Sequence, residues 1–170
     1  MLLPKGAIHV SATLADADTR VLGGSEVKTK DKSRNQVAAL PFRVRQGGPE
    51  VMLITSRETG RWVVPKGWPQ KGRAPHAVAA REAYEEAGLV GNIEKRRIGT
   101  YRYAKRLSLK STVVCKVSVF PLHVEQELED FPEKFVRQRC WLTPGEAANR
   151  VQERGLSKLL LTRALRPRRR

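Results

Sequence analysis

Acidic residues are scarce in this chain of 170 residues, which has 17 aspartates and glutamates against 33 lysines and arginines. The net charge of +16 at pH 7 predicts a surface potential that gathers anions. Polyphosphorylated small molecules, nucleic acid and acidic membrane are all candidates. Part of the charge lies in the last eight residues, in a tail that is typical of a solvated chain end, with nucleic-acid or membrane contact as the second reading. The arginines of this tail are Arg163, Arg166, Arg168, Arg169 and Arg170.

Long apolar runs are also missing. No stretch approaches the roughly 18 apolar residues of a membrane-spanning helix, so no membrane span is expected. The short apolar start is interrupted by Pro4 and Lys5, which argues against a secretory signal. Cys115 and Cys140 lie in segments that read as core strands, where they could pair if adjacent. Isolated buried thiols in a reducing cytoplasm are the expectation.

The chain divides into three parts by pattern. Residues 1–34 lack sustained periodicity and are predicted to be a flexible arm. The folded domain is expected to span residues 35–163, and residues 164–170 form the basic tail. Within the domain, strands are predicted at residues 36–44, 50–55, 61–64, 93–103, 111–124 and 136–142. An acidic loop is expected at residues 125–134, and a terminal helical segment starts at Thr143, a suitable N-cap. This order of elements predicts an α+β fold.

The most informative stretch is residues 67–89. A helix is predicted from Pro75 to Gly88, because proline suits a first helical turn and glycine the left-handed position after the last turn. Glu82, Glu85 and Glu86 then fall within about a quarter of the helix circumference. An apolar side is predicted to face the core. Its members are Ala77, Ala80, Ala83, Tyr84 and Ala87.

The three carboxylates of this helix repel one another, since like charges four residues apart destabilise a helix by about 0.2–0.5 kcal/mol. Arg81 can relieve Glu85 from the preceding turn, but Glu82 and Glu86 remain opposed. A divalent cation would remove the repulsion, because Mg²⁺ binds a few carboxylates together with substrate phosphate oxygens. A solvated acidic face is the ordinary interpretation of such a helix. The spacing of the surrounding residues argues against it.

Gly67 and residues 81–89, R-E-A-Y-E-E-A-G-L, carry that spacing. They resemble the Nudix box, in which a glycine, five residues, a glutamate and seven residues precede Arg-Glu-apolar-any-Glu-Glu-any-Gly-apolar. Eight of the nine defined positions match, and the ninth, the first glutamate, is Arg73. The chain is therefore identified as a member of the Nudix hydrolase family.

The resemblance implies the αβα sandwich of that family, with a mixed sheet. It also implies hydrolysis of a phosphoanhydride by water attack at phosphorus, with Mg²⁺ or Mn²⁺ neutralising phosphoryl oxygens and activating water. The implied metal ligands are Glu82, Glu85, Glu86 and the carbonyl oxygen of Gly67. Glu85 and Glu86 are also the implied catalytic residues of the box.

Two further residues of the site follow from the resemblance. Several Nudix enzymes place an extra glutamate after the long strand, and Glu127 is chosen here from a group that includes Glu125 and Glu129. In the family, the arginine at Arg81 commonly pairs with a box glutamate. Because Arg73 stands where the first glutamate is expected, either Glu85 takes over as the partner or the loop is held differently.

Beyond the box, the chain is similar to one branch of the family, the diphosphoinositol polyphosphate phosphohydrolases, over residues 36–142. The matching segments are V-M-L-I-T-S-R, R-W-V-V-P-K-G, V-E-Q-E-L-E-D-F and R-Q-R-C-W-L. This similarity implies a diphosphoinositol polyphosphate or a dinucleoside polyphosphate as substrate. Basic and hydroxyl side chains then become candidates for phosphate contact. The candidates for substrate binding are Arg43, Ser56, Arg57, Lys66, Lys71 and Arg73.

Two other functions are compatible with the same residues. The positive charge favours removal of pyrophosphate from RNA 5′ ends through attraction of phosphates. A catalytically silent basic module that binds RNA or other anions, with a box decayed at Arg73, is the second. The three retained glutamates argue against that module, because anion binding without metal has no use for them. Trp68 could stack on an adenine or cover the core, and the sequence does not separate these roles.

Overall fold

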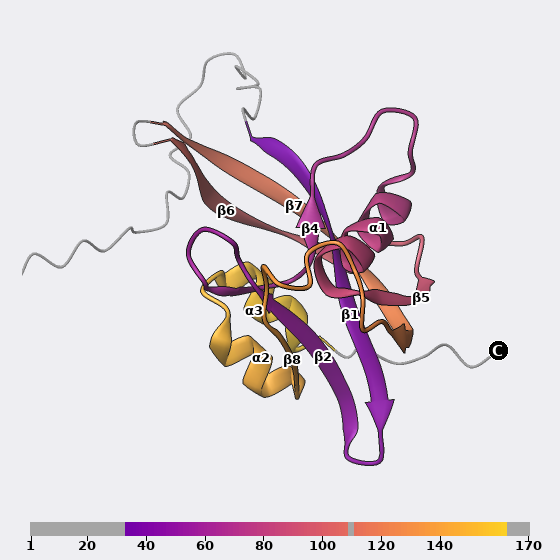
Figure 1. Ribbon diagram of the computed structural model, residues 1–170. Coiled ribbons are helices and arrows are strands. Elements are labelled where there is room, and N and C mark those ends of the chain that lie inside the picture. The colour runs from indigo at the N-terminus through magenta and orange to yellow at the C-terminus, as the bar shows by residue number, and fades with distance from the viewer. Residues whose placement is uncertain (1–32, 109–110, 163–170) are drawn as a thin grey trace, which may run out of the picture. The chain divides into compact units, whose positions relative to one another are not determined.

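The computed structural model describes residues 33–108 and 111–162 (Figure 1). Residues 1–32 of the predicted arm and the basic tail lie outside this range, so the arm and tail stay predictions. The described part contains these elements: β1 (Arg34–Arg45), β2 (Gly48–Thr55), β3 (Trp62–Val63), β4 (Lys66–Gly67), α1 (Pro75–Ala87), β5 (Leu89–Ile93), β6 (Gly99–Ser108), β7 (Ser111–Glu127), β8 (Arg139–Leu142), α2 (Pro144–Arg150) and α3 (Arg154–Leu160).

The strands form one mixed sheet. Its main path runs β3-β2-β1-β7-β5, while β4 pairs with β1, β6 with β7, and β8 with β2. The β1–β7 pair is parallel, with Val37 beside Ser118 and Leu40 beside Pro121. The other described pairs are antiparallel.

Helices cover both faces of this sheet, with α1 on one side and α2 and α3 on the other (Figure 1). Because side chains of a strand alternate between the two faces of a sheet, β1 contributes side chains to two separate cores. Val37 and Ala39 join the α1 core, whereas Ala38 and Leu40 join the core under α2 and α3. The predicted αβα sandwich with a mixed sheet is confirmed.

Helix α1 begins and ends where the sequence predicts, but its buried face is rotated from the predicted one. Gly88 follows it with φ 65°, a left-handed conformation that favours glycine. Val78 and Ala79 are fully buried, whereas Ala77 and Tyr84 are exposed, so the prediction that those two face the core was wrong. Glu86 is buried instead, because it has a charged partner in the loop before β8.

Three other elements differ from the sequence prediction. The strand predicted at residues 93–103 is two strands, β5 and β6, separated by the charged stretch 94–98. The long strand continues to Glu127, so the acidic loop begins three residues later than expected. The terminal helical segment is two helices; Thr143 caps the first in a capping box with Glu146.

The two cysteines are free thiols: Cys115, on β7, is buried, and Cys140, on β8, is only partly buried. Among the described helices, none is long and apolar enough to cross a membrane.

Candidate functional site

The backbone of β4 brings the acidic helix against the sheet. Gly67 pairs with Val37 on β1, and the chain then reaches α1 through an exposed loop. A Cβ atom at Gly67 would overlap the carboxylate of Glu82. The glycine of the box therefore allows a close approach between β4 and the Glu82 carboxylate, which a larger residue would displace.

The other two glutamates of α1 are held by arginines. Glu86 is 7% exposed, accepts a hydrogen bond from the backbone N–H of Lys66 at 3.0 Å, and forms an ion pair with Arg137. Glu85 accepts a hydrogen bond from Nε of Arg81 at 2.7 Å. Arg81 also donates to Gln70 at 3.0 Å, which fixes the loop that lacks the expected box glutamate.

Burial and mutual repulsion shift the ionisation of this cluster. Burial, followed by the charges of Glu86 and Glu85, raises the pKa of Glu82 from 4.5 to about 7. Burial also raises the pKa of Glu86, against the opposing effect of Arg137. The pKa of Lys66 is lowered, mainly because its ammonium is desolvated. A positive charge added beside Glu82 would therefore be favourable.

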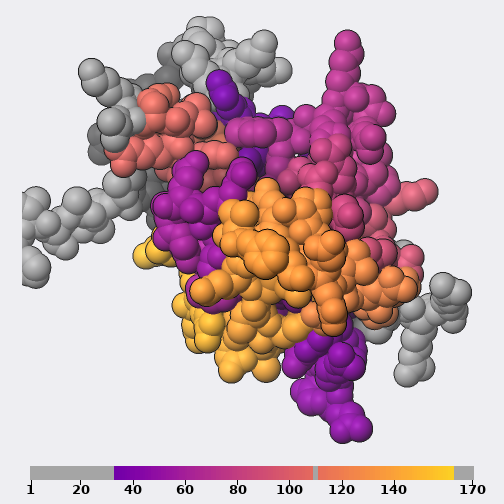
Figure 2. Space-filling view, in the orientation of Figure 1, coloured from indigo at the N-terminus to yellow at the C-terminus, as the bar shows by residue number. Residues whose placement is uncertain are grey.

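A cavity of about 370 Å³ opens beside Glu82 and Glu86. Six segments line it: the start of β1, the β2–β3 loop, β4 with the following residue, α1, the second half of β6, and the loop before β8. Figure 2 shows this side, with the loop before β8 in orange between the purple β2–β3 loop and the magenta α1 region. The cavity is rich in cations, which suits an anionic ligand. They are Arg57, Arg61, Lys66, Lys105, Arg106 and Arg137.

Arg137 and Glu133 are cavity residues that the sequence analysis missed. The Arg137 side chain is 5% exposed and lies between Glu86 and Glu133. Its Nε atom donates a hydrogen bond to Glu133 at 2.6 Å. It also donates to the carbonyl oxygen of Thr55 at 2.9 Å. Glu133 lies within the predicted acidic loop and Arg137 follows it, and no periodic pattern marks either residue; the R-Q-R-C-W-L match was the available signal for Arg137.

The donor atoms suit a divalent cation, although arginines engage two of the three carboxylates. Within residues 33–108 and 111–162, no group of three or more His, Cys, Asp or Glu residues is arranged to hold a metal. In the same structure Arg137 pairs with Glu86 and Arg81 pairs with Glu85. The raised pKa of Glu82 beside Glu86 indicates a deficit of positive charge that a cation would fill. The residues therefore fit a metal chemically, provided that Glu86 is shared with or released by Arg137.

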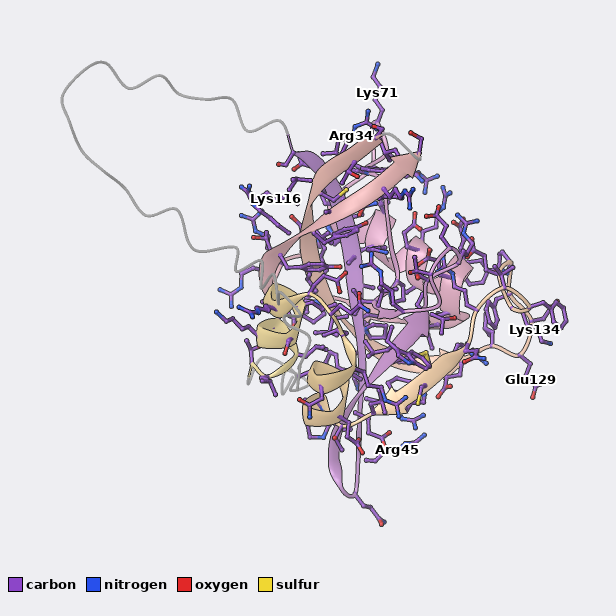
Figure 3. All side chains as sticks on the ribbon, turned by 90° about the vertical axis from the view of Figure 1, so that its left-hand side faces the viewer. Arg34, Arg45, Lys71, Lys116, Glu129 and Lys134 are labelled. Atoms are coloured by element: carbon purple, nitrogen blue, oxygen red, sulfur yellow. The ribbon has the colours of Figure 1, made fainter. Side chains whose placement is uncertain are left out.

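Three of the predicted substrate-binding residues line the cavity: Ser56, Arg57 and Lys66. Lys71 and Arg73 lie in the exposed loop between β4 and α1 and are not among its lining residues. In Figure 3 the side chain of Lys71 points outward at one end of the molecule.

The structure also keeps Arg43 and Glu127 out of this cavity. Nη1 of Arg43 donates to Glu127 at 2.6 Å, and Nε donates to Glu50 at 2.6 Å. Nε1 of Trp141 donates to the same oxygen of Glu127 at 2.9 Å. Glu127 therefore lies on β7 rather than in a loop. Glu85, although it is on α1, is also absent from the cavity lining.

Comparison with known proteins identifies sequence relatives. A NUDIX domain model matches residues 32–161. Nudix hydrolase 18, mitochondrial, from Arabidopsis thaliana is 31% identical over 138 residues, covering 76% of this chain and 76% of that protein. Diphosphoinositol polyphosphate phosphohydrolase 2 from Rattus norvegicus is 29% identical over 132 residues, covering 75% of this chain and 69% of that protein.

Solved structures share the fold. An Ap4A hydrolase from C. elegans superposes with a TM-score of 0.55 at 19% identity, over 75% of this chain and 92% of that one. The NUDIX domain of Shewanella oneidensis NrtR, in complex with ADP ribose, superposes with a TM-score of 0.54 at 15% identity, over 79% and 90%.

Proposed function

Because this chain belongs to the Nudix hydrolase family, whose members hydrolyse phosphoanhydride bonds with divalent metal ions, we propose that it cleaves a highly phosphorylated small molecule. The observation that carries the proposal is the cavity, in which Glu82 and Glu86 face six cations. Carboxylates for a metal and cations for phosphates are the two components that phosphoanhydride hydrolysis needs.

In this proposal, Glu82, Glu86 and the carbonyl oxygen of Gly67 hold Mg²⁺ or Mn²⁺, and Glu85 supports them through Arg81. When bound, the metal neutralises phosphoryl oxygens and lowers the pKa of the attacking water. Arg137 divides its hydrogen bonds between Glu86 and the substrate phosphates. Its Nε atom continues to donate to Glu133.

Ser56, Arg57 and Lys66 bind further phosphate oxygens, because they line the same cavity as the carboxylates. Glu133 replaces Glu127 as the candidate carboxylate outside α1, because Glu133 lines the cavity whereas Glu127 lies on β7 and is absent from the lining. Glu133 is therefore our candidate to align the attacking water.

Two substrate classes are the candidates. The name of the rat relative points to diphosphoinositol polyphosphates, and the sequence resemblance to the same branch of the family implies dinucleoside polyphosphates as well. Trp68 favours a nucleotide. It lines the cavity, is 38% exposed, and has the Lys105 ammonium 5.1 Å from its ring centroid. Stacking of a base on an exposed aromatic side chain contributes about 1–3 kcal/mol.

The test is phosphate release by the full chain with Mg²⁺, with Mn²⁺ and with excess chelator. Diadenosine pentaphosphate, a diphosphoinositol polyphosphate and 5′-triphosphorylated RNA are compared in parallel. We expect release to need metal and to be fastest with one of the first two substrates. Full activity in chelator, with metal absence verified, would refute the metal assignment. Fastest release from RNA would support the RNA 5′-pyrophosphohydrolase alternative, and binding without release the silent module.

A cytoplasmic location is the remaining part of the proposal. Several relatives carry organelle names, among them the mitochondrial Nudix hydrolase 18. Fractionation of cells that express the full chain tests this point directly.

A further inference from the structure

Glu153 is a buried carboxylate that the proposed reaction does not use. It occupies the N-cap position of α3, where an acidic side chain ordinarily accepts hydrogen bonds from the first N–H groups of the helix. Its side chain makes no such bond. Instead, Oε1 lies 3.2 Å from Nη1 of Arg61, and the side chain is only 7% exposed. Glu153 therefore forms an ion pair with Arg61 and does not cap its own helix.

Arg61 connects this buried carboxylate to the cavity. It lines the cavity, whereas Glu153 does not. Its guanidinium carbon lies 5.6 Å from the centroid of the Tyr103 ring, and the Lys66 ammonium lies 5.7 Å from the same centroid. The Tyr103 hydroxyl in turn donates to Gln36 at 2.7 Å. Arg61 is thus placed at the cavity wall by an ion pair outside the cavity and by an aromatic ring within it.

The polar atoms around this ion pair complement one another. Within the described residues, Arg61 Nε, Glu153 Oε2 and the Tyr101 hydroxyl are buried without a hydrogen-bond partner. The first is a donor, the second an acceptor, and the hydroxyl is both. Burial, followed by the charge of Glu153, raises the pKa of Tyr101, so its hydroxyl keeps the proton.

Tight helix packing fixes where Glu153 lies. A Cβ atom at Gly155 would lie 2.7 Å from the Cβ of Tyr101, and one at Gly99 would collide with Leu159. Helix α3 therefore approaches β6 closely at Gly155, where an added Cβ would meet the Cβ of Tyr101, whereas the end of the Leu159 side chain could move away at Gly99. The backbone at the start of this helix, which carries Glu153, is thereby held against β6.

We propose that Glu153 is a positioning residue that holds the guanidinium of Arg61 at the cavity wall for contact with a substrate phosphate. Glu153 Oε1 engages one of the three guanidinium nitrogens, so further N–H groups of this planar fork can point to phosphate oxygens. The proposal rests on the proposed function, because it assigns Arg61 a phosphate only if the cavity binds a polyphosphate.

Steady-state kinetics of Glu153→Gln with diadenosine pentaphosphate and Mg²⁺ test the proposal. We expect KM to rise about tenfold, which corresponds to about 1.4 kcal/mol, and kcat to stay within threefold. That split arises because a misplaced phosphate-binding group weakens substrate and transition state alike. Glu146→Gln is the matched control, since Glu146 caps α2 and does not line the cavity. It should lower the melting temperature and leave KM unchanged.

A double-mutant cycle separates positioning from simple stabilisation. In an Arg61→Ala background, Glu153→Gln should raise KM no further, because its effect passes through Arg61. An additional rise in that background, or an unchanged KM in folded Glu153→Gln, would overturn the proposal. If the glutamine variant does not fold, Arg61→Lys replaces it; an unchanged KM there would equally refute the role. Lack of metal-dependent hydrolysis by the unmodified chain would instead refute the proposed function, so it is measured first.

Discussion

At the scale of single residues, Glu86 links catalysis to stability. Its carboxylate is buried between the Lys66 backbone and Arg137, and it is also a proposed metal ligand. Glu86→Gln should reduce turnover by at least a hundredfold, about the effect of losing a principal charge-stabilising contact. The unfolding free energy of the metal-free protein should fall by about 1–3 kcal/mol, because Arg137 loses one of its two carboxylates. Phosphate release and urea titration measure the two effects.

Glu85→Gln is the control for this experiment. Glu85 is on the same helix and pairs with Arg81, but it does not line the cavity. Its replacement should lower turnover far less than the change at Glu86. A Glu86→Gln protein whose turnover stays within threefold of the original would contradict the ligand role.

The raised pKa of Glu82 predicts how stability depends on pH. Its pKa is 4.5 when unfolded and about 7 when folded without metal, so the folded state binds more protons between these values. The metal-free protein should therefore lose stability as pH rises from 4.5 to 7, by about 1 kcal/mol after allowance for solvent screening. Glu82→Gln should remove this loss, and the variant should be the more stable protein at pH 8.

Urea titrations of metal-free protein at pH 5 and pH 8 measure this effect. The difference between Glu82→Gln and the unmodified chain should grow from pH 5 to pH 8. Glu85→Gln should show no such gain, since it removes an ion pair with Arg81. An equal difference at both pH values would show that Glu82 is not destabilised by its ionisation.

At the scale of elements, the loop between β4 and α1 is held without the expected box glutamate. Arg81 binds Glu85 and Gln70, and Arg73 stays exposed outside the cavity. Arg73→Glu should therefore change neither KM nor melting temperature appreciably. Arg57→Glu is the matched charge reversal, because Arg57 is also exposed but lines the cavity, and it should raise KM. A rise of more than threefold with Arg73→Glu would restore the sequence-based prediction that Arg73 binds substrate.

The same loop illustrates how far the sequence predicts this fold. Local signals located α1 and its end at Gly88, because proline, glycine and the box spacing lie within the element itself. The Thr143 cap was predicted for the same reason. The break between β5 and β6 was not, since the charged stretch 94–98 has no glycine or proline until Gly99. A local sequence pattern predicts an element best when residues with special backbone preferences, such as proline, glycine or a cap residue, mark its ends.

Only those site residues that lie close together in the sequence were predicted. Glu82 and Glu86 lie on one helix, so their spacing revealed them. Arg137 and Glu133 reach the cavity from a loop whose position depends on β8 pairing with β2. The Arg61–Glu153 pair joins residues 92 positions apart through the docking of α3 on β6. Such contacts depend on tertiary packing, which a sequence pattern does not encode.

At the scale of the whole molecule, positive charge is in excess although α1 carries an acidic face. The net charge is +16, and six of the cations line the cavity. A long polyphosphate can contact several of them, and each charge-assisted hydrogen bond contributes about 1.5–3 kcal/mol before screening. A ligand with two phosphates can use fewer. The specificity constant should therefore be higher for diadenosine pentaphosphate than for ADP-ribose.

Salt should weaken this preference, because the screening length falls from about 30 Å at 0.01 M to about 8 Å at 0.15 M ionic strength. The measurement is the ratio of kcat/KM for diadenosine pentaphosphate to that for ADP-ribose at these two ionic strengths. Both substrates carry an adenine, so stacking on Trp68 largely cancels in the ratio and the phosphates remain. We expect a ratio above one that decreases with salt. A ratio below one at low salt would mean that the cavity cations serve another anion, and 5′-triphosphorylated RNA would then be the first substrate to test.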